Sequence, residues 1–170
     1  MTESSSSEQH ELVHFNLAMA RHPIDHPAMA GFATQVEAVN RLAETSSGFA
    51  WMAADGEAGD AVAAFGSALA LASISTWRSV EELRRFVYGG VHGNALTRRR
   101  DWFEPVRGPA YVLWWVPRGH RPAWSEAKQR LQVLATHGPT RDAFTFTTAF
   151  TPSGHPLATS LSSGDRSNQR

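Results

Sequence analysis

The chain has no cysteine among its 170 residues. Disulfides, zinc fingers with thiolate ligands and a cysteine nucleophile are therefore excluded together. The absence of cysteine fits a reducing compartment. The polar, Ser-rich start over residues 1–9 also lacks the basic and apolar regions of a secretory signal. We therefore expect a cytoplasmic protein.

An excess of charge of either sign is also missing, because 16 Lys and Arg side chains balance 16 Asp and Glu side chains. The acidic residues Asp101 and Glu104 compensate the charge of the basic run at residues 98–100, so no long-range electrostatic field attracts phosphates. The most apolar segment, residues 62–74, is interrupted by glycine and serine and is too short to span a bilayer. Neither nucleic acid nor a membrane is an expected partner.

Apolar and aromatic residues are abundant, at 42% hydrophobic residues with six Trp and nine Phe. This composition supports a packed core and excludes disorder of the whole chain. The two ends are polar and without apolar periodicity, so burial there cannot offset the entropy of ordering. We expect one folded domain over residues 10–150, with disordered tails at 1–9 and 151–170.

The periodicity of apolar residues predicts the order strand, helix, strand, strand, helix, strand. Strands are expected at residues 12–19, 49–53, 67–77 and 111–116, with the turn-rich residues 55–60 joining the second and third in a hairpin. The first helix is expected from about residue 29 to 46. Ser79 and Glu82 form a capping box that begins the second, which runs toward Trp102 with a bend near Gly89.

This order predicts an α+β fold of the ferredoxin-like, split βαβ kind. A helix over residues 124–136 and an edge strand over residues 143–150 are expected as a C-terminal addition. Large apolar side chains alternate onto both faces of the strand at residues 111–116. One layer of helices covers one face, so we expect the other face to meet a second copy in a homodimer with facing sheets.

Three stretches of the sequence resemble a known family. They are STWRSVEEL from Ser75, followed by FVY and RRRDWF; LWWVPRGHRP from Leu113; and the closing GP and AFTF from Gly138. They are similar to the family catalogued as a domain of unknown function, DUF3291. The resemblance implies the dimeric α+β barrel superfamily, whose relatives include small cofactor-independent monooxygenases, polyketide cyclases and haem-binding enzymes.

His92 is the first candidate catalytic residue, because an imidazole is the natural base near neutral pH. Tyr88 precedes it by four residues, which on a continuous helix places both side chains on one face. Tyr88 would orient the substrate or stabilise an oxyanion. Glycines at 89, 90 and 93 surround His92 where the resembled family is expected to use better helix formers, which suggests an altered or widened pocket. The alternative is a structural histidine that caps backbone groups or packs under Trp102.

His14 and Asn16 share one face of the first strand, where buried polar groups need partners. They would line a cavity, with Trp77, Trp102, Trp115 and Phe86 as an aromatic wall. The resemblance implies that Asn16, Trp77 and Trp115 are analogous to residues that hold an enolate in cofactor-free monooxygenases. The alternative is that His14 and Asn16 satisfy each other across the dimer interface while the Trp side chains form core.

No cofactor is expected, and haem is the alternative, with His92 as its proximal ligand. The histidines at positions 22 and 26 have the right type for a metal, but Pro23 and Pro27 prevent the helix that would align them. We therefore expect no metal site.

The sequence thus predicts a biosynthetic enzyme that acts on a small apolar or aromatic molecule. General-base catalysis without a cofactor would drive an oxygenation, a cyclisation or a rearrangement, all of which begin with deprotonation. The alternative from another class is a non-catalytic dimeric ligand-binding or stress protein. A cavity filled by side chains would favour the alternative.

Overall fold

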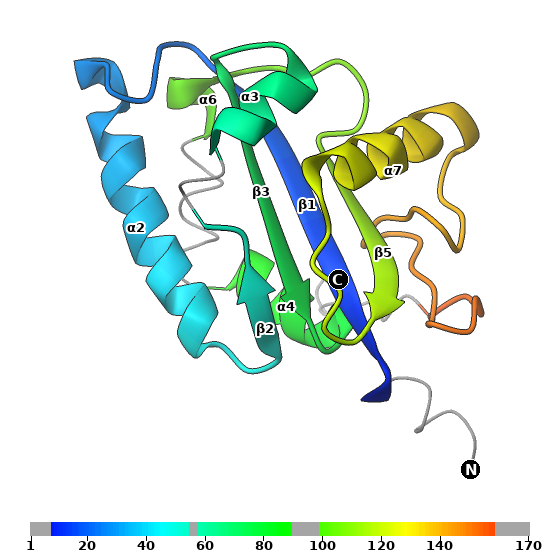
Figure 1. Cartoon of the computed structure of the whole chain (residues 1–170). Helices are drawn as coiled ribbons and strands as arrows, with labels where there is room; N and C mark the ends of the chain where they lie inside the picture. Colours follow the sequence, from blue (N-terminus) through cyan, green and yellow to red (C-terminus); the bar gives the residue numbers. More distant parts are fainter. Residues whose placement is uncertain (1–7, 55–57, 90–98, 159–170) are drawn as a thin grey trace, which may run out of the picture.

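The structure is a computed structural model that describes residues 8–54, 58–89 and 99–158 (Figure 1). The elements follow one another along the chain as β1 (His10–Ala20), η1 (Pro27–Met29), α2 (Ala30–Thr45), β2 (Phe49–Met52), α3 (Ala58–Phe65), β3 (Ala70–Trp77), α4 (Val80–Tyr88), α6 (Arg99–Trp102), β4 (Phe103–Glu104), β5 (Tyr111–Pro117) and α7 (Trp124–His137).

The strands form one five-stranded antiparallel sheet with β1 near its centre. β3 pairs along one edge of β1 and is followed outward by β2. The other edge of β1 pairs with β5 over residues 10–16 and with the short β4 at Met19 and Ala20. The expected α+β fold with ferredoxin-like topology is confirmed.

α3 and α7 cover one face of this sheet, in front of it in Figure 1. The sheet contributes alternate side chains to this cluster, as the two-residue period of a strand requires. Phe15 stacks on Phe65 of α3, with ring centroids 5.4 Å apart. Ala127 and Leu134 of α7 are buried against the same cluster.

The opposite face is covered by α4, by the end of α2 at Ala43 and by the segment that follows α7. Leu12, Trp77 and Leu113 point into this second cluster from three neighbouring strands. Phe144 lies fully buried among them. A third, smaller cluster joins the start of α2 to α6 and β4.

Other elements of the same chain cover both faces of the sheet, so no open sheet face supports the expected homodimer with facing sheets. Trp114 is 1% exposed and Val116 is 3% exposed within a single chain. The sequence predicts one layer of helices, whereas α3 and α7 form a second layer on the other face. The homodimer itself stays a prediction without that support.

Two expectations about the elements within the domain are wrong: the direct turn between the second and third strands, and the length of the second helix. The second and third strands do pair, but α3 separates them where a tight hairpin turn was expected. The second helix ends at Tyr88, because Gly89 adopts an extended conformation with φ −91° and ψ 145°. Ser79 is confirmed as the N-cap, since its Oγ accepts a hydrogen bond from the Glu82 backbone N–H at 3.2 Å. The Glu82 carboxylate accepts from the Ser79 hydroxyl at 3.1 Å.

The C-terminal helix is confirmed as α7. The expected edge strand at residues 143–150 is not formed: among the described residues, a single bridge, between Leu113 and Phe144, joins this segment to the sheet. The chain then turns twice and continues to pack beyond the expected boundary at residue 150. Leu157 donates its backbone N–H to Ala149 at 2.8 Å and contacts the second cluster. This added segment forms the far wall of the site described next.

Candidate functional site

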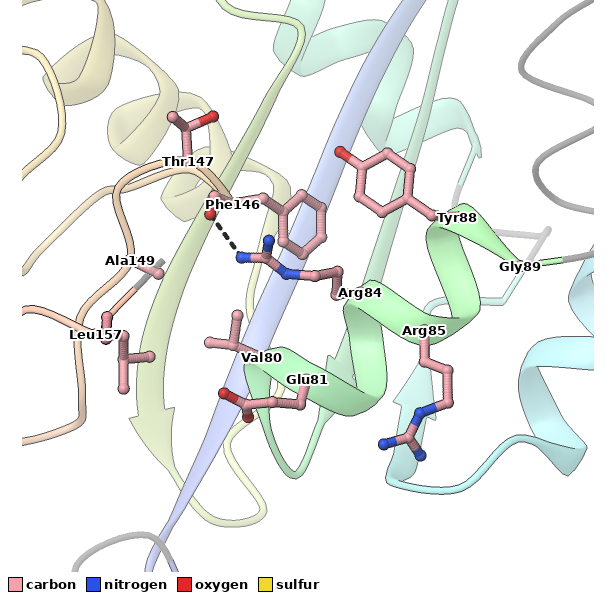
Figure 2. A pocket seen from close by; sticks show the side chains of 11 residues that line it. Val80, Glu81, Arg84, Arg85, Tyr88, Gly89, Phe146, Thr147, Ala149 and Leu157 are labelled. Atoms are coloured by element: carbon pink, nitrogen blue, oxygen red, sulfur yellow. Dashed lines mark hydrogen bonds between the residues drawn. The ribbon is translucent and has the colours of Figure 1, made fainter. Parts of the chain in front are cut away.

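A groove with a volume of about 550 Å³ runs between α4 and the C-terminal segment (Figure 2). The residues that line it are Val80, Glu81, Arg84, Arg85, Tyr88, Gly89, Phe146, Thr147, Ala149, Leu157 and Ala158. Its floor is apolar, because Val80 and Ala149 are buried there and Leu157 is half-buried. The charged and aromatic groups lie higher, on α4 and at Phe146.

The amphipathic sequence of α4 divides its side chains between the core and this groove. Val80, Leu83 and Val87 are buried against the sheet. Glu81, Arg84, Arg85 and Tyr88 line the groove. The two arginines follow Glu81 by three and four residues and precede Tyr88 by four and three, which is the spacing of one helix face. The spacing of charged and apolar residues in α4 thus dictates which side chains reach the groove.

Arg84 crosses the groove from α4 to the C-terminal segment (Figure 2). Its Nη2 donates a hydrogen bond to the carbonyl oxygen of Phe146 at 2.6 Å. Its guanidinium carbon also lies 5.5 Å from the centroid of the Phe146 ring, within the range of a cation–π contact. These contacts hold the guanidinium group in place. Because a carbonyl oxygen carries no net charge, the positive charge of Arg84 is not neutralised.

Tyr88 and Phe146 form the aromatic end of the groove. Their rings meet edge to face, with centroids 5.6 Å apart and an interplanar angle of 65°. Tyr88 is 61% exposed, which is unusual for a large aromatic side chain and leaves one face of its ring accessible to a ligand.

His14 and Tyr111 lie behind Phe146. The His14 ring is buried, with its centroid 6.3 Å from that of Phe146 and 6.3 Å from that of Tyr111. The Tyr111 hydroxyl accepts a hydrogen bond from the Phe146 backbone N–H at 3.2 Å. Burial raises the pKa of Tyr111, and the nearby Tyr88 adds to this, against the opposing effects of Phe146, Thr145 and Arg84. The phenol is therefore held neutral.

The predicted polar site residues are only partly brought together. Tyr88 lines the groove and His14 lies behind its wall. Asn16 is half-buried on the same face of β1 as His14, opposite Tyr111 and Ser73 on the neighbouring strands. Of these three side chains, Tyr88 alone is among the residues that line the groove.

The predicted aromatic wall is dispersed through the core. Trp77 stacks on Phe86 with centroids 4.9 Å apart and donates its indole N–H to Ser75 Oγ. Trp115 donates its indole N–H to the carbonyl oxygen of Phe150 at 2.7 Å. Trp102 lies in the separate cluster between α6 and the start of α2. These side chains do not line the groove.

His92 lies outside the described residues. A continuous helix would be needed to place His92 and Tyr88 on one face, and α4 ends at Tyr88, where Gly89 becomes extended. The haem alternative depended on His92 and is equally untested. Among the described lining residues, Tyr88 is the one side chain of a type known to ligate haem iron.

Sequence reasoning missed Arg84, Arg85 and Phe146. The helical spacing of α4 could have identified the two arginines as neighbours of Tyr88. No local signal joins Phe146 to them, because 62 residues separate it from Arg84.

Over the described ranges, no three His, Asp or Glu side chains gather closely enough to hold a metal ion. The helices in that same part of the chain also lack the length and apolar character needed to cross a bilayer.

Comparisons with known proteins complete the description. No curated protein sequence matches the chain. A solved structure, described as the NE2512 protein of unknown function from Nitrosomonas europaea, superposes with a TM-score of 0.43 at 10% identity, over 67% of this chain and 94% of that one. The model of the family DUF3291, a domain of unknown function, matches residues 11–160. The chain therefore belongs to the DUF3291 family.

Proposed function

We propose that this protein binds a small, partly aromatic molecule in the groove between α4 and the C-terminal segment. The observation that carries the proposal is the groove itself. Its volume of about 550 Å³ lies within the range of small-molecule sites. Its lining combines an apolar floor, two aromatic rings and a few charged groups, which is the composition typical of such sites.

The packing beneath α4 favours this surface groove over a buried chamber. Trp77, Leu83 and Phe144 are fully buried between the helix and the sheet. Side chains fill this interior at the positions where the sequence predicted a catalytic cavity. A filled interior supports the ligand-binding alternative over the enzyme.

Ligand titration of the full-length protein tests the proposal. 3-Phenylpropanoate and 3-phenylpropanamide are suitable probes, each with one ring and a short chain. We expect Tyr88→Ala to weaken binding of both by about tenfold, through loss of the aromatic wall. Leu42→Ala is the matched control, because Leu42 is an exposed apolar residue on α2. Equal binding by wild type and Tyr88→Ala, or no binding by wild type, would contradict the proposal.

A second candidate is the cofactor-independent enzyme, in which deprotonation of the bound molecule leads to oxygenation, cyclisation or rearrangement. One observation favours it: the imidazole of His14 contacts Phe146, which walls the groove. A local movement of Phe146 would bring a bound C–H acid within reach of that base.

Hydrogen–deuterium exchange tests this second candidate without knowledge of the later reaction. Phenylpyruvate in D₂O reports deprotonation through loss of its benzylic proton signals. The enzyme hypothesis expects acceleration above the buffer rate, reduced about a hundredfold in His14→Gln. Circular dichroism establishes that the His14→Gln variant folds. Tyr88→Phe is the comparison variant: it keeps the ring at an exposed position and His14 in place, so exchange should stay accelerated. Exchange at the buffer rate in wild type would leave ligand binding as the function.

A further inference from the structure

We propose that the groove selects aromatic molecules that carry a single carboxylate, with Arg84 as the group that binds it. This inference rests on the proposed function, since it names the class of ligand that the same groove takes.

The charges on α4 favour an anionic ligand. Arg84 and Arg85 contribute two positive charges to the lining, and Glu81 contributes one negative charge. Within the described part of the chain, no salt bridge joins either arginine to an acidic group. Glu81 and Arg85 stand four residues apart, a spacing that commonly forms an ion pair, yet they remain separate here. Both guanidinium charges therefore remain available.

Arg84 is positioned in advance for a planar anion. The hydrogen bond from its Nη2 to the Phe146 carbonyl fixes the side chain across the groove. A guanidinium group has five N–H donors, so the others can still bind a carboxylate through two parallel hydrogen bonds. A side chain that is already ordered loses less entropy on binding than a free one.

The aromatic end of the groove sets the length of the ligand. Tyr88 follows Arg84 by four residues, which is about one helical turn or ~5.4 Å along α4. A ring against Tyr88 and Phe146 and a carboxylate at Arg84 thus require a spacer of two or three atoms. Glu81 lies almost one turn to the other side of Arg84 and disfavours a second negative charge. The matching ligand is a monoanionic arylalkanoate.

Isothermal titration with three matched compounds tests this inference. 3-Phenylpropanoate carries the ring and the charge, 3-phenylpropanamide keeps the ring without the charge, and 3-cyclohexylpropanoate keeps the charge without the aromatic ring. We expect wild type to bind the first compound at least about tenfold more tightly than either of the others. The preference over the amide should shrink with added salt.

Arg84→Gln removes the positive charge, but it also removes the contact with Phe146 and so could change the shape of the groove. Comparing the acid with the amide separates these two effects. A shape change weakens the acid and the amide equally, whereas loss of the anion site abolishes the preference for the acid. Arg85→Gln, at an exposed position, should reduce that preference by about threefold. Arg41→Gln on α2 removes the same charge at a residue that does not line the groove, so this variant should still prefer the acid over the amide.

The outcomes distinguish this inference from the proposed function. Equal affinity for acid and amide in wild type would overturn the anion assignment while leaving the groove as a ligand site. Equal affinity for the phenyl and cyclohexyl acids would overturn the aromatic part. A preference for the acid that survives Arg84→Gln would remove Arg84 as the anchor. No binding of any compound would refute both proposals together.

Discussion

Trp114 of the sheet donates its indole N–H to Glu126 Oε1 of α7 at 2.9 Å, and the other oxygen of that carboxylate lies 2.8 Å from Nε2 of His120. Trp114 is buried and Glu126 is half-buried. One carboxylate thus connects the central sheet, the first turn of α7 and the loop between β5 and α7. This connection holds α7 over the face of the sheet where the sequence had predicted a second copy.

We predict that Glu126→Ala lowers the free energy of unfolding by about 1–3 kcal/mol, since it leaves a buried indole N–H without its acceptor. Glu126→Gln should cost less, because its amide oxygen can still accept that hydrogen bond. Urea unfolding measures both. Glu44→Ala on the exposed side of α2 is the control and should change stability by less than about 0.5 kcal/mol. A loss no larger in Glu126→Ala than in Glu44→Ala would show that the contact does not stabilise the fold.

Gly48 and Gly108 allow backbone strain to be separated from steric overlap. Both have positive φ, at 82° and 81°. A Cβ at Gly48 would lie 2.2 Å from Glu82 Oε2, whereas a Cβ at Gly108 would have nothing within 4 Å. Gly108→Ala therefore measures the cost of the left-handed conformation alone, about 1–2 kcal/mol.

We predict that Gly48→Ala costs more than Gly108→Ala in urea unfolding. The added methyl group displaces Glu82 from its hydrogen bonds with Ser47 and Ser79 and so weakens the start of α4. Loss of such a cap adds about 1 kcal/mol to the conformational cost. Equal losses in the two variants would mean that Glu82 moves aside without consequence.

Much of the fold could be predicted because its signals are local. Alternation identified β1 and β5, and the Ser79 and Glu82 pair identified the start of α4. α3 was missed because it begins within the turn-rich stretch and its small residues give a weak periodic pattern. The alternation of Phe144 and Phe146 predicted a strand, but those rings pack into the second cluster with little strand pairing.

The candidate site could be predicted only on its helical side. Tyr88 was identified by its position on α4, whereas its partner Phe146 is brought there by long-range packing. The aromatic residues chosen for the wall were selected by type. Trp77 and Trp115 instead donate their indole N–H groups within the folded domain, to the Ser75 hydroxyl and the Phe150 carbonyl oxygen. Residue type alone does not separate a core aromatic from a binding aromatic.

The cover that α7 provides leads to a prediction about stability and assembly. Leu134 is 6% exposed against the sheet, so we expect Leu134→Ala to cost about 2–5 kcal/mol. Because each chain covers its own sheet, association through the sheet should contribute nothing to stability, and that face should give the urea midpoint no dependence on protein concentration. Gln132→Ala on the exposed side of α7 is the control. A midpoint that rises with concentration, together with a dimer in light scattering, would support association through the sheet.

Tyr111 supports a prediction for alkaline pH. Burial raises the pKa of its hydroxyl, so the folded state favours the neutral phenol more strongly than the unfolded state does. The resulting stability is fully present below the ordinary pKa of tyrosine, about 10, and is lost as the pH rises toward the raised pKa of the folded state. We therefore expect the free energy of unfolding to fall above about pH 10.

The protein contains two tyrosines, so Tyr88→Phe leaves Tyr111 as the single titrating phenol. Its tyrosinate absorbance should appear at a higher pH than that of N-acetyltyrosinamide. Tyr111→Phe should remove this part of the pH dependence, while costing about 1 kcal/mol at neutral pH through loss of the acceptor for the Phe146 N–H. A midpoint at or below that of the free amide would mean that water reaches Tyr111, and the aromatic wall behind the groove would then be open rather than packed.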